Sequence, residues 1–287
     1  MSQEDVCKLW VALCPVLLTL MMTRAYTWPF CTTLLERSTK PVNMRATTTT
    51  RTGCVRHGVG HKTPFWGRGS RNATEDPRPN ILQLNTEGIT ADNISVIEQL
   101  AYENKAFIIA LQETHCTNAD KLVIHNFSLA GLVLSKNHGL ATFIHERLEC
   151  SLVHQSPEQL ETEWLCVDNA GYEIINVYKP PRSRFTPRAF PTFPHPSLYV
   201  GEFNCQHVNW GYKKTSPDGE SLEAWATCSN FGLLYNPNET ASFFSHRWNV
   251  GKNPDLAFAS FGQDSRLPDR RVLGKFPRSQ HRPSLIT

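Results

Sequence analysis

The sequence predicts an α/β fold in which two packed sheets carry helices on their outer faces. Strand-like apolar runs alternate with a helical pattern early in the chain, and hairpin patterns follow in the middle. Because sheets and helices must each bury an apolar face, this mixture is best satisfied by sheet layers placed between helix layers.

The elements are predicted from periodicity and turn signals. In chain order they are a strand at 81–85, a helix near 91–104, a strand at 107–113, paired strands within 121–135 and 139–148, a hairpin at 164–178, a strand at 197–204, a helix near 219–230 and a strand at 254–260. The first helix places Ile94, Ile97 and Ala101 on one face, and Thr90 is its expected N-cap.

Residues 1–78 differ in composition from the rest and are expected to form a poorly structured N-terminal extension. They contain an apolar stretch at 9–22, too short to span a bilayer comfortably, and an aperiodic stretch rich in threonine and glycine. The apolar stretch is either an incidental leader or a signal-peptide core, and Glu4, Asp5 and Pro15 argue against the second. Residues 79–287 are expected to form one globular domain.

Cysteine usage favours an intracellular protein. The nine cysteines include no CxxC spacing, so neither a disulfide framework nor a zinc site is indicated. The formal net charge of +3 is too small to indicate nucleic-acid binding by itself. Sequons at Asn72, Asn93, Asn126 and Asn238 leave secretion open as the alternative.

Several apolar runs end in a polar residue, and these ends are expected to meet. The runs are 81–85, 108–113, 198–204 and 279–281. Each is predicted to be a buried strand that delivers an Asn, Glu or His to the sheet edge, where a catalytic site is expected.

The ends of the first two runs carry candidate metal ligands. Glu113 follows a strand so apolar that an unpaired carboxylate there would be costly to bury. Mg²⁺ prefers one or two carboxylates with water and substrate phosphate, which fits this position. The alternatives are a strand-end Glu that reaches solvent and, for Asn85, a turn-forming Asn.

The later runs carry candidate catalytic residues. In Gly201-Glu202-Phe203-Asn204, the carboxylate can orient or deprotonate a water and the Asn amide can hold a phosphate oxygen. His281 suits an anionic transition state, and Asp255 can accept from its imidazole and fix the tautomer. Tyr178 has a hydroxyl able to touch a phosphate. The simpler interpretations are that His281 is a surface histidine and that Tyr178 is an ordinary aromatic residue of a strand.

Basic side chains gather in two segments near these candidates. The clusters are Lys179, Arg182, Arg184 and Arg188, and Arg266, Arg270, Arg271, Lys275, Arg278 and Arg282. They are either solvated loops or phosphate contacts, and their nearness to the candidate site favours phosphate contacts, above all for Arg182, Arg184, Arg278 and Arg282.

Six ordered segments resemble the endonuclease/exonuclease/phosphatase superfamily, and more closely the endonuclease domain of non-LTR retrotransposons. They are Gln83-Leu84-Asn85, Leu111-Gln112-Glu113-Thr114-His115, Asn176-Val177-Tyr178, Gly201-Glu202-Phe203-Asn204, the run 254–260 and Gln280-His281-Arg282-Pro283. The likeness covers about residues 79–287.

The resemblance implies a four-layer α/β sandwich that cuts DNA with Mg²⁺, or with Mn²⁺ as the alternative ion. It implies a nuclear setting, no organic cofactor and no membrane partner. In similar enzymes the residue matching Glu113 binds the metal and the one matching Asn85 assists. A reverse transcriptase domain usually follows such a domain, and this chain has six residues after His281. An isolated or truncated endonuclease module is therefore expected.

The resemblance also assigns the other roles. The matches of Asn204 and Tyr178 hold the scissile phosphate, and the match of His281, held by that of Asp255, assists in-line attack by water. This chain departs from the pattern at Glu202, where the family has Asp, and at Gln280, where it has a metal-binding Asp.

These departures leave several functions open. Glu202 displaces its carboxylate by about 1 Å, which can cost ~10²-fold in rate. The favoured function is a DNA endonuclease with weak or absent nicking. The alternatives are a catalytically silent nucleic-acid-binding remnant of the same fold, a secreted deoxyribonuclease-like enzyme, and a hydrolase of small phosphate esters.

Overall fold

The computed structural model describes residues 78–157, 160–262 and 266–287. The expectations for residues 1–77, including the apolar stretch at 9–22 and the sequon at Asn72, lie outside the described residues. Within them, no helix combines the length and the apolar character needed to cross a bilayer.

The first six-stranded sheet holds the early apolar runs at its centre. Its strands lie in the order β13 (Arg270–Val272), β14 (Ser284–Ile286), β1 (Ile81–Asn85), β2 (Ile108–Gln112), β4 (Leu140–His145) and β3 (Phe127–Val133). Strands β1 and β2 are parallel, and their neighbours pair antiparallel. Every residue of β1 and β2 is buried, as expected for strands covered on both faces.

The second six-stranded sheet holds the later runs. Its order is β5 (Ser151–Gln155), β6 (Glu163–Asn169), β7 (Tyr172–Tyr178), β8 (Ser197–Glu202), β12 (Asp255–Ser260) and β9 (Phe231–Leu233). Strands β7 and β8 are parallel, and the other pairs are antiparallel. The predicted hairpin at 164–178 is confirmed, and its turn residues Ala170 and Gly171 both have positive φ. A separate two-stranded sheet consists of β10 (Phe243–Ser245) and β11 (Val250–Lys252).

The two predicted helices are present. Helix α2 (Ala91–Glu103) begins after Thr90, whose side chain accepts a hydrogen bond from the Asn93 N–H, so the predicted N-cap is confirmed. Helix α3 (Pro217–Cys228) begins after Ser216, which caps it in the same way. Short 3₁₀ turns lie at Ala119–Lys121 (η1) and Val208–Trp210 (η2).

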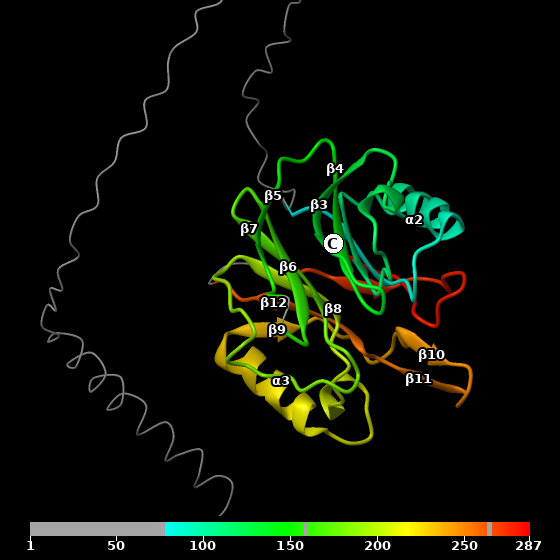
Figure 1. The fold of residues 1–287 in the computed structure, drawn as a ribbon. Helices are drawn as coiled ribbons and strands as arrows, with labels where there is room; N and C mark the ends of the chain where they lie inside the picture. The colour runs from blue at the N-terminus through cyan, green and yellow to red at the C-terminus, as the bar shows by residue number, and fades with distance from the viewer. Residues whose placement is uncertain (1–77, 158–159, 263–265) are drawn as a thin grey trace, which may run out of the picture. The chain divides into compact units, whose positions relative to one another are not determined.

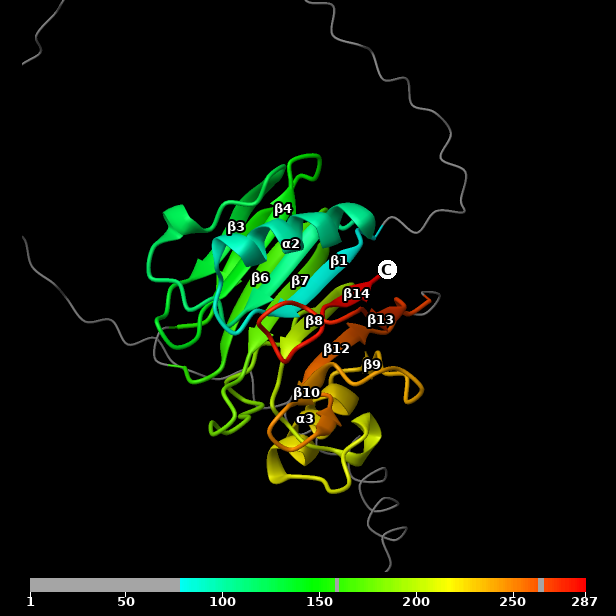
Figure 2. The ribbon, with the colours of Figure 1, turned by 90° about the vertical axis from the view of Figure 1, so that its right-hand side faces the viewer.

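Three apolar clusters lie between four layers, which are helix α2, the first sheet, the second sheet and helix α3. Ile97 and Ala101 of α2 pack against the outer face of the first sheet. Leu222 and Trp225 of α3 pack against the outer face of the second sheet. A third cluster fills the space between the sheets, and α2 and α3 lie on opposite outer sides (Figures 1 and 2). The structure therefore confirms the predicted α/β sandwich of two mixed sheets flanked by helices.

One element prediction is wrong and another is confirmed over a shorter range. The segment 279–281 is not a strand: His281 makes a single antiparallel bridge to Phe243, and the strand begins at Ser284. The predicted pairing of 121–135 with 139–148 is confirmed, but strand β3 begins only at Phe127, and the residues before it form η1 and a loop. The segment 279–281 contains no apolar residue, so no local period specifies a strand there.

Candidate active site

The candidate residues gather where strands from both sheets end. Asn85 ends β1, Glu113 follows β2, Tyr178 ends β7 and Glu202 ends β8, while Asp255 begins the antiparallel β12. Because β1 runs parallel to β2 and β7 to β8, these positions share one end of the sandwich. Side-chain hydrogen bonds cross between the sheets there, from Asn85 to Glu202 and from Tyr178 to Glu113.

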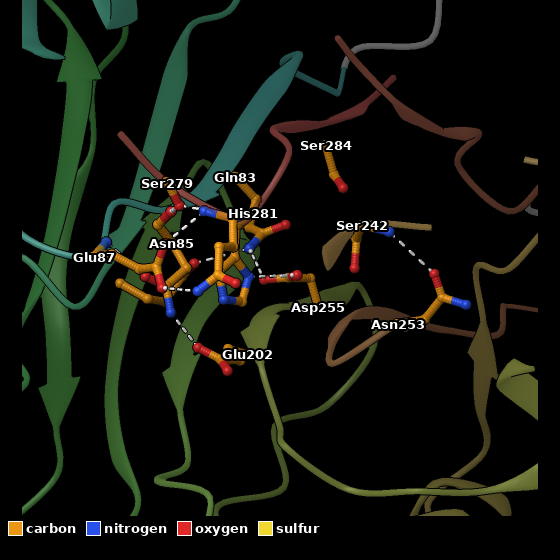
Figure 3. Close-up of polar contacts among 12 residues, drawn as sticks. Gln83, Asn85, Glu87, Glu202, Ser242, Asn253, Asp255, Ser279, His281 and Ser284 are labelled. Carbon is orange, nitrogen blue, oxygen red and sulfur yellow. Dashed lines mark hydrogen bonds and ion pairs between the residues drawn. The ribbon is translucent and has the colours of Figure 1, made fainter. Parts of the chain in front are cut away.

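Asp255 and His281 form a buried pair at the centre of the site. The His281 Nδ1 lies 2.9 Å from Asp255 Oδ2, and the two residues are 4% and 0% exposed (Figure 3). Burial lowers the pKa of His281, but the Asp255 carboxylate, together with Glu202 and Glu87, outweighs this effect and raises the pKa to about 9. The imidazole is therefore a cation at neutral pH, with its orientation set by Asp255.

Glu202 lies beside this pair and is itself buried. Burial raises the pKa of the Glu202 carboxyl to about 8; the His281 cation opposes the shift, while Asp255 and Glu113 add to it. The Asn85 side-chain amide donates to Glu202 Oε2. The carboxyl therefore holds a proton over much of the neutral range, which suits an acid better than a base.

Glu113 and Tyr178 form the neighbouring pair. The Tyr178 hydroxyl donates to Glu113 Oε1 at 2.5 Å, and burial together with this bond raises the pKa of the phenol. Glu113 has a φ of 48°, and its carboxylate lies 3.7 Å from the His115 imidazole. The side chain of Glu113 is 18% exposed, so one carboxylate reaches the open side of the site.

Backbone geometry places Asn204 beside the other residues. A Cβ added at Gly201 would meet the Val177 carbonyl oxygen at 1.9 Å, so only glycine permits β7 and β8 to approach this closely. Asn204 has a φ of 48°, and its Nδ2 donates to the Lys179 carbonyl at 3.0 Å. The Lys179 N–H in turn donates to the Glu202 carbonyl.

Gln280 is held by Glu87, a residue that the sequence did not single out. The Gln280 N–H donates to Glu87 Oε2 at 2.5 Å, its Nε2 lies 3.3 Å from Glu87 Oε1, and its Oε1 accepts from the His246 N–H. Glu87 also donates its N–H to Asn85 Oδ1, so Asn85 forms a turn as well as facing Glu202. Glu87 thus brings a carboxylate beside Gln280, the residue at which the family resemblance implies an Asp. The available signal was the pair Glu87-Gly88 directly after a strand, which indicates a turn of positive φ.

The basic clusters divide into exposed and buried members. Arg182, Arg184 and Arg278 are exposed, and Arg282 is half-buried beside His281. Arg278 Nη2 lies 3.0 Å from Asp92, and a cavity of about 410 Å³ is bordered by Arg278, Arg282, Phe244 and His281.

Two members of these clusters are not available to phosphate. Lys179 is 0% exposed and pairs with Asp218 at 3.5 Å. Arg270 is buried and donates to the Asp255 carbonyl and to Ser284 Oγ. The sequence suggested a phosphate-facing role for both, and that suggestion is wrong because their charges are satisfied inside the fold.

The sequence also left three buried amides without a role. Gln83, Gln112 and Asn176 are each at most 1% exposed; a hydrogen bond joins Gln83 to Gln112 within the first sheet, and another joins Gln112 to Asn176 across the two sheets. Their signal was a polar residue in the middle of an otherwise apolar strand, where an unpaired amide would be costly.

The oxygen donors at the site suit a hard divalent cation. Among the described residues no group of three or more His, Cys, Asp or Glu side chains is arranged to hold a metal ion. Mg²⁺ does not require such a cage, since it keeps several waters and binds one or two carboxylates with substrate phosphate. The partly exposed Glu113 carboxylate, with the Asn85 amide oxygen and Glu87 nearby, is a donor set of that kind.

Solved structures share this fold at low sequence identity. The endonuclease domain of TRAS1, a telomere-specific non-LTR retrotransposon, matches with a TM-score of 0.53 and 15% identity over 73% of this chain and 98% of its own. The AP endonuclease LMAP from Leishmania major matches with a TM-score of 0.57 and 16% identity over 78% and 92% of the two chains. An AP endonuclease from Archaeoglobus fulgidus gives a TM-score of 0.56 and 15% identity over 73% and 99%.

These proteins have the endonuclease/exonuclease/phosphatase fold, and this chain shares it. No family model and no curated protein sequence matches the chain. At these identities the likeness establishes the fold alone.

Proposed function

We propose that this protein is a Mg²⁺-dependent DNA endonuclease of retrotransposon origin whose nicking is weak. The observation that carries the proposal is the buried Asp255–His281 pair beside Glu202, at the end of the sheets where Glu113 and Asn85 also lie. The solved structures that share the fold add support, since they are AP endonucleases and a retrotransposon endonuclease domain.

Glu113 and Asn85 would hold the metal, with Glu87 and Gln280 beside them. When bound, Mg²⁺ supplies Lewis-acid stabilisation of the negative charge on the phosphate. Asn204 would hold a non-bridging oxygen of the scissile phosphate with its second amide N–H, and Tyr178 would hold another once its hydroxyl turns from Glu113.

The protein side chains would perform the proton and charge chemistry. Glu202 orients the attacking water and accepts its proton as the oxygen bonds to phosphorus and the bond to the leaving sugar oxygen breaks. The His281 cation, fixed by Asp255, stabilises the charge of the pentavalent transition state. Arg182, Arg184, Arg278 and Arg282 would contact the DNA backbone without reading sequence.

Weak nicking is proposed because Glu202 is poorly suited to accept a proton. Its raised pKa of about 8 leaves the carboxyl largely protonated at neutral pH, and its extra methylene relative to Asp moves the oxygens by about 1 Å. The same features support the second candidate function, a DNA-binding protein that retains the fold without cleavage.

A plasmid-nicking assay distinguishes the two. The purified protein is incubated with supercoiled plasmid and Mg²⁺, with His281→Ala as the control variant. The endonuclease proposal expects slow nicking by the wild type, none in EDTA and a loss of at least tenfold in His281→Ala. Equal, residual cleavage by both proteins together with salt-sensitive DNA binding would establish the silent remnant instead.

A further inference from the structure

A chain of buried side-chain amides crosses between the two sheets and ends on Asp255. Gln112 Nε2 donates to Asn176 Oδ1 at 2.6 Å. Gln83 Nε2 donates to Gln112 Oε1 at 2.8 Å and to Asp255 Oδ1 at 3.2 Å. The four residues lie on β7, β2, β1 and β12 and are at most 1% exposed, so no solvent competes for these bonds.

Asn176, at the far end of this series of hydrogen-bonded amides, fixes which way each amide group points. Asn176 Nδ2 donates to the Leu111 and Ala141 carbonyls and to Thr142 Oγ1, so its oxygen faces Gln112. Gln112 Nε2 donates to Asn176 and also approaches the Ala110 carbonyl, so its own oxygen faces Gln83. Each amide therefore has one orientation that satisfies its partners.

Gln83 is the link that transmits this direction to the site. The Gln83 NH₂ group meets two acceptors, Gln112 Oε1 and Asp255 Oδ1. A flipped amide would place the Gln83 oxygen against both of these oxygens, with no donor between them. Leaving a buried polar group unpaired is energetically costly, so the flipped state is disfavoured.

The Asp255 carboxylate is consequently held at both oxygens. Oδ1 accepts from Gln83, while Oδ2 bonds the His281 Nδ1 at 2.9 Å (Figure 3). Rotation of the carboxylate would break one bond or both. The Arg270 guanidinium, bonded to the Asp255 carbonyl, fixes the backbone at the same residue.

We propose that Gln83 is a positioning residue that orients Asp255 and, through it, the His281 imidazole. The catalytic meaning of this role rests on the proposed function, since the Asp255–His281 pair is part of the active site only if the protein hydrolyses phosphodiesters. The orientation itself can be measured without any cleavage.

The test compares Gln83→Met with Gln112→Met as the matched control. Both variants remove a buried amide of similar volume from the same layer, but only Gln83 touches Asp255. The readout is the low-field proton resonance of the His281 Nδ1–H, recorded at one fixed pH and assigned by its absence in His281→Asn. We expect Gln83→Met to shift this resonance or broaden it by solvent exchange. Gln112→Met should move it much less, because Gln83 keeps its bond to Asp255 in that variant, although both variants lose stability.

Gln83→Asn keeps the amide but withdraws it by one methylene. This variant replaces Gln83→Met in the test if the methionine variant does not fold. It too should move the resonance. A folded Gln83→Met or Gln83→Asn protein with the wild-type resonance would overturn the proposal, as would equal shifts in the Gln83 and Gln112 variants. In the nicking assay, Gln83→Met should lower kcat about tenfold with KM unchanged. A wild type without nicking would reject the proposed function and leave the resonance test intact.

Discussion

Glu202 and Asp255 stand directly opposite each other on the neighbouring antiparallel strands β8 and β12. Both are buried, and like charges in such a pair are unfavourable. The two carboxyls meet this problem differently. Asp255 pairs with His281, whereas burial raises the pKa of Glu202 to about 8 and keeps its proton at neutral pH.

Replacing Glu202 with Gln should stabilise the metal-free protein in a pH-dependent way. The pKa of the Glu202 carboxyl rises from 4.5 to about 8 on folding. Between these values the unfolded chain has released a proton that the folded chain retains, so the contribution of Glu202 to wild-type stability falls as pH rises from 5 to 8. Gln has no such proton. Urea unfolding in EDTA should show an advantage for Glu202→Gln that grows across this window, to about 2–4 kcal/mol.

An exposed substitution provides the control for this measurement. Glu146→Gln, at an exposed position, should follow the wild-type dependence on pH. A constant difference between Glu202→Gln and the wild type from pH 5 to 8 would contradict the raised pKa of Glu202.

Replacing Glu202 with Asp should increase nicking. The shorter side chain withdraws the carboxylate by about 1 Å and restores the residue that the family resemblance implies, and misplacements of this size can cost ~10²-fold in rate. We expect Glu202→Asp to nick supercoiled plasmid roughly ten- to a hundredfold faster than the wild type in Mg²⁺. Equal rates would mean that Glu202 does not limit cleavage.

Glu113 should account for metal binding. A ligand that binds only the folded state raises its stability, so Mg²⁺ should raise the Tm of the wild type. Glu113→Gln removes the exposed carboxylate and should abolish that increase, while keeping the hydrogen bond from Tyr178. Glu163→Gln, on β6, is the control variant, and its Tm should still rise when Mg²⁺ is added. A Mg²⁺-dependent Tm in Glu113→Gln equal to that of the wild type would place the ion elsewhere.

The Lys179–Asp218 pair should contribute to stability rather than to DNA binding. Removing one partner of a buried pair leaves an uncompensated charge. Asp218→Asn should therefore destabilise the protein by about 1–3 kcal/mol, less than for a fully buried pair because Asp218 is 29% exposed. Lys179→Met, which removes the buried charge itself, should cost less. A larger loss in Lys179→Met, or weaker DNA binding without a loss of stability, would contradict this assignment.

The exposed arginines should determine how DNA binding depends on salt. Each phosphate contact adds about one unit to the slope of log K against log salt. The double variants Arg182→Ala/Arg184→Ala and Arg278→Ala/Arg282→Ala should each lower the slope by about two units, measured by fluorescence anisotropy. Arg147, which follows β4 at the opposite end of the sandwich, is the control. An unchanged slope in both double variants would remove these arginines from the interface.

Much of the fold could be predicted from local patterns. The apolar runs at 81–85 and 108–112, the Thr90 cap and the positive-φ turn at Ala170-Gly171 are local features, because propensity and periodicity act over a few residues. The segment 279–281 was misread because its position depends on a bridge to Phe243, which is distant in the sequence.

The sequence by itself determined which strands end in polar residues and, from their order, the superfamily that the chain resembles. Only the tertiary structure decided which charges face the site. The Lys179 and Arg270 side chains are 0% and 4% exposed, Glu87 stands beside Gln280, and Gln83 reaches Asp255 across 172 positions of sequence. The physical reason is that the energy of a charge or an amide depends on its burial and its partners. Those partners are set by how two sheets pack and not by neighbouring residues in the chain.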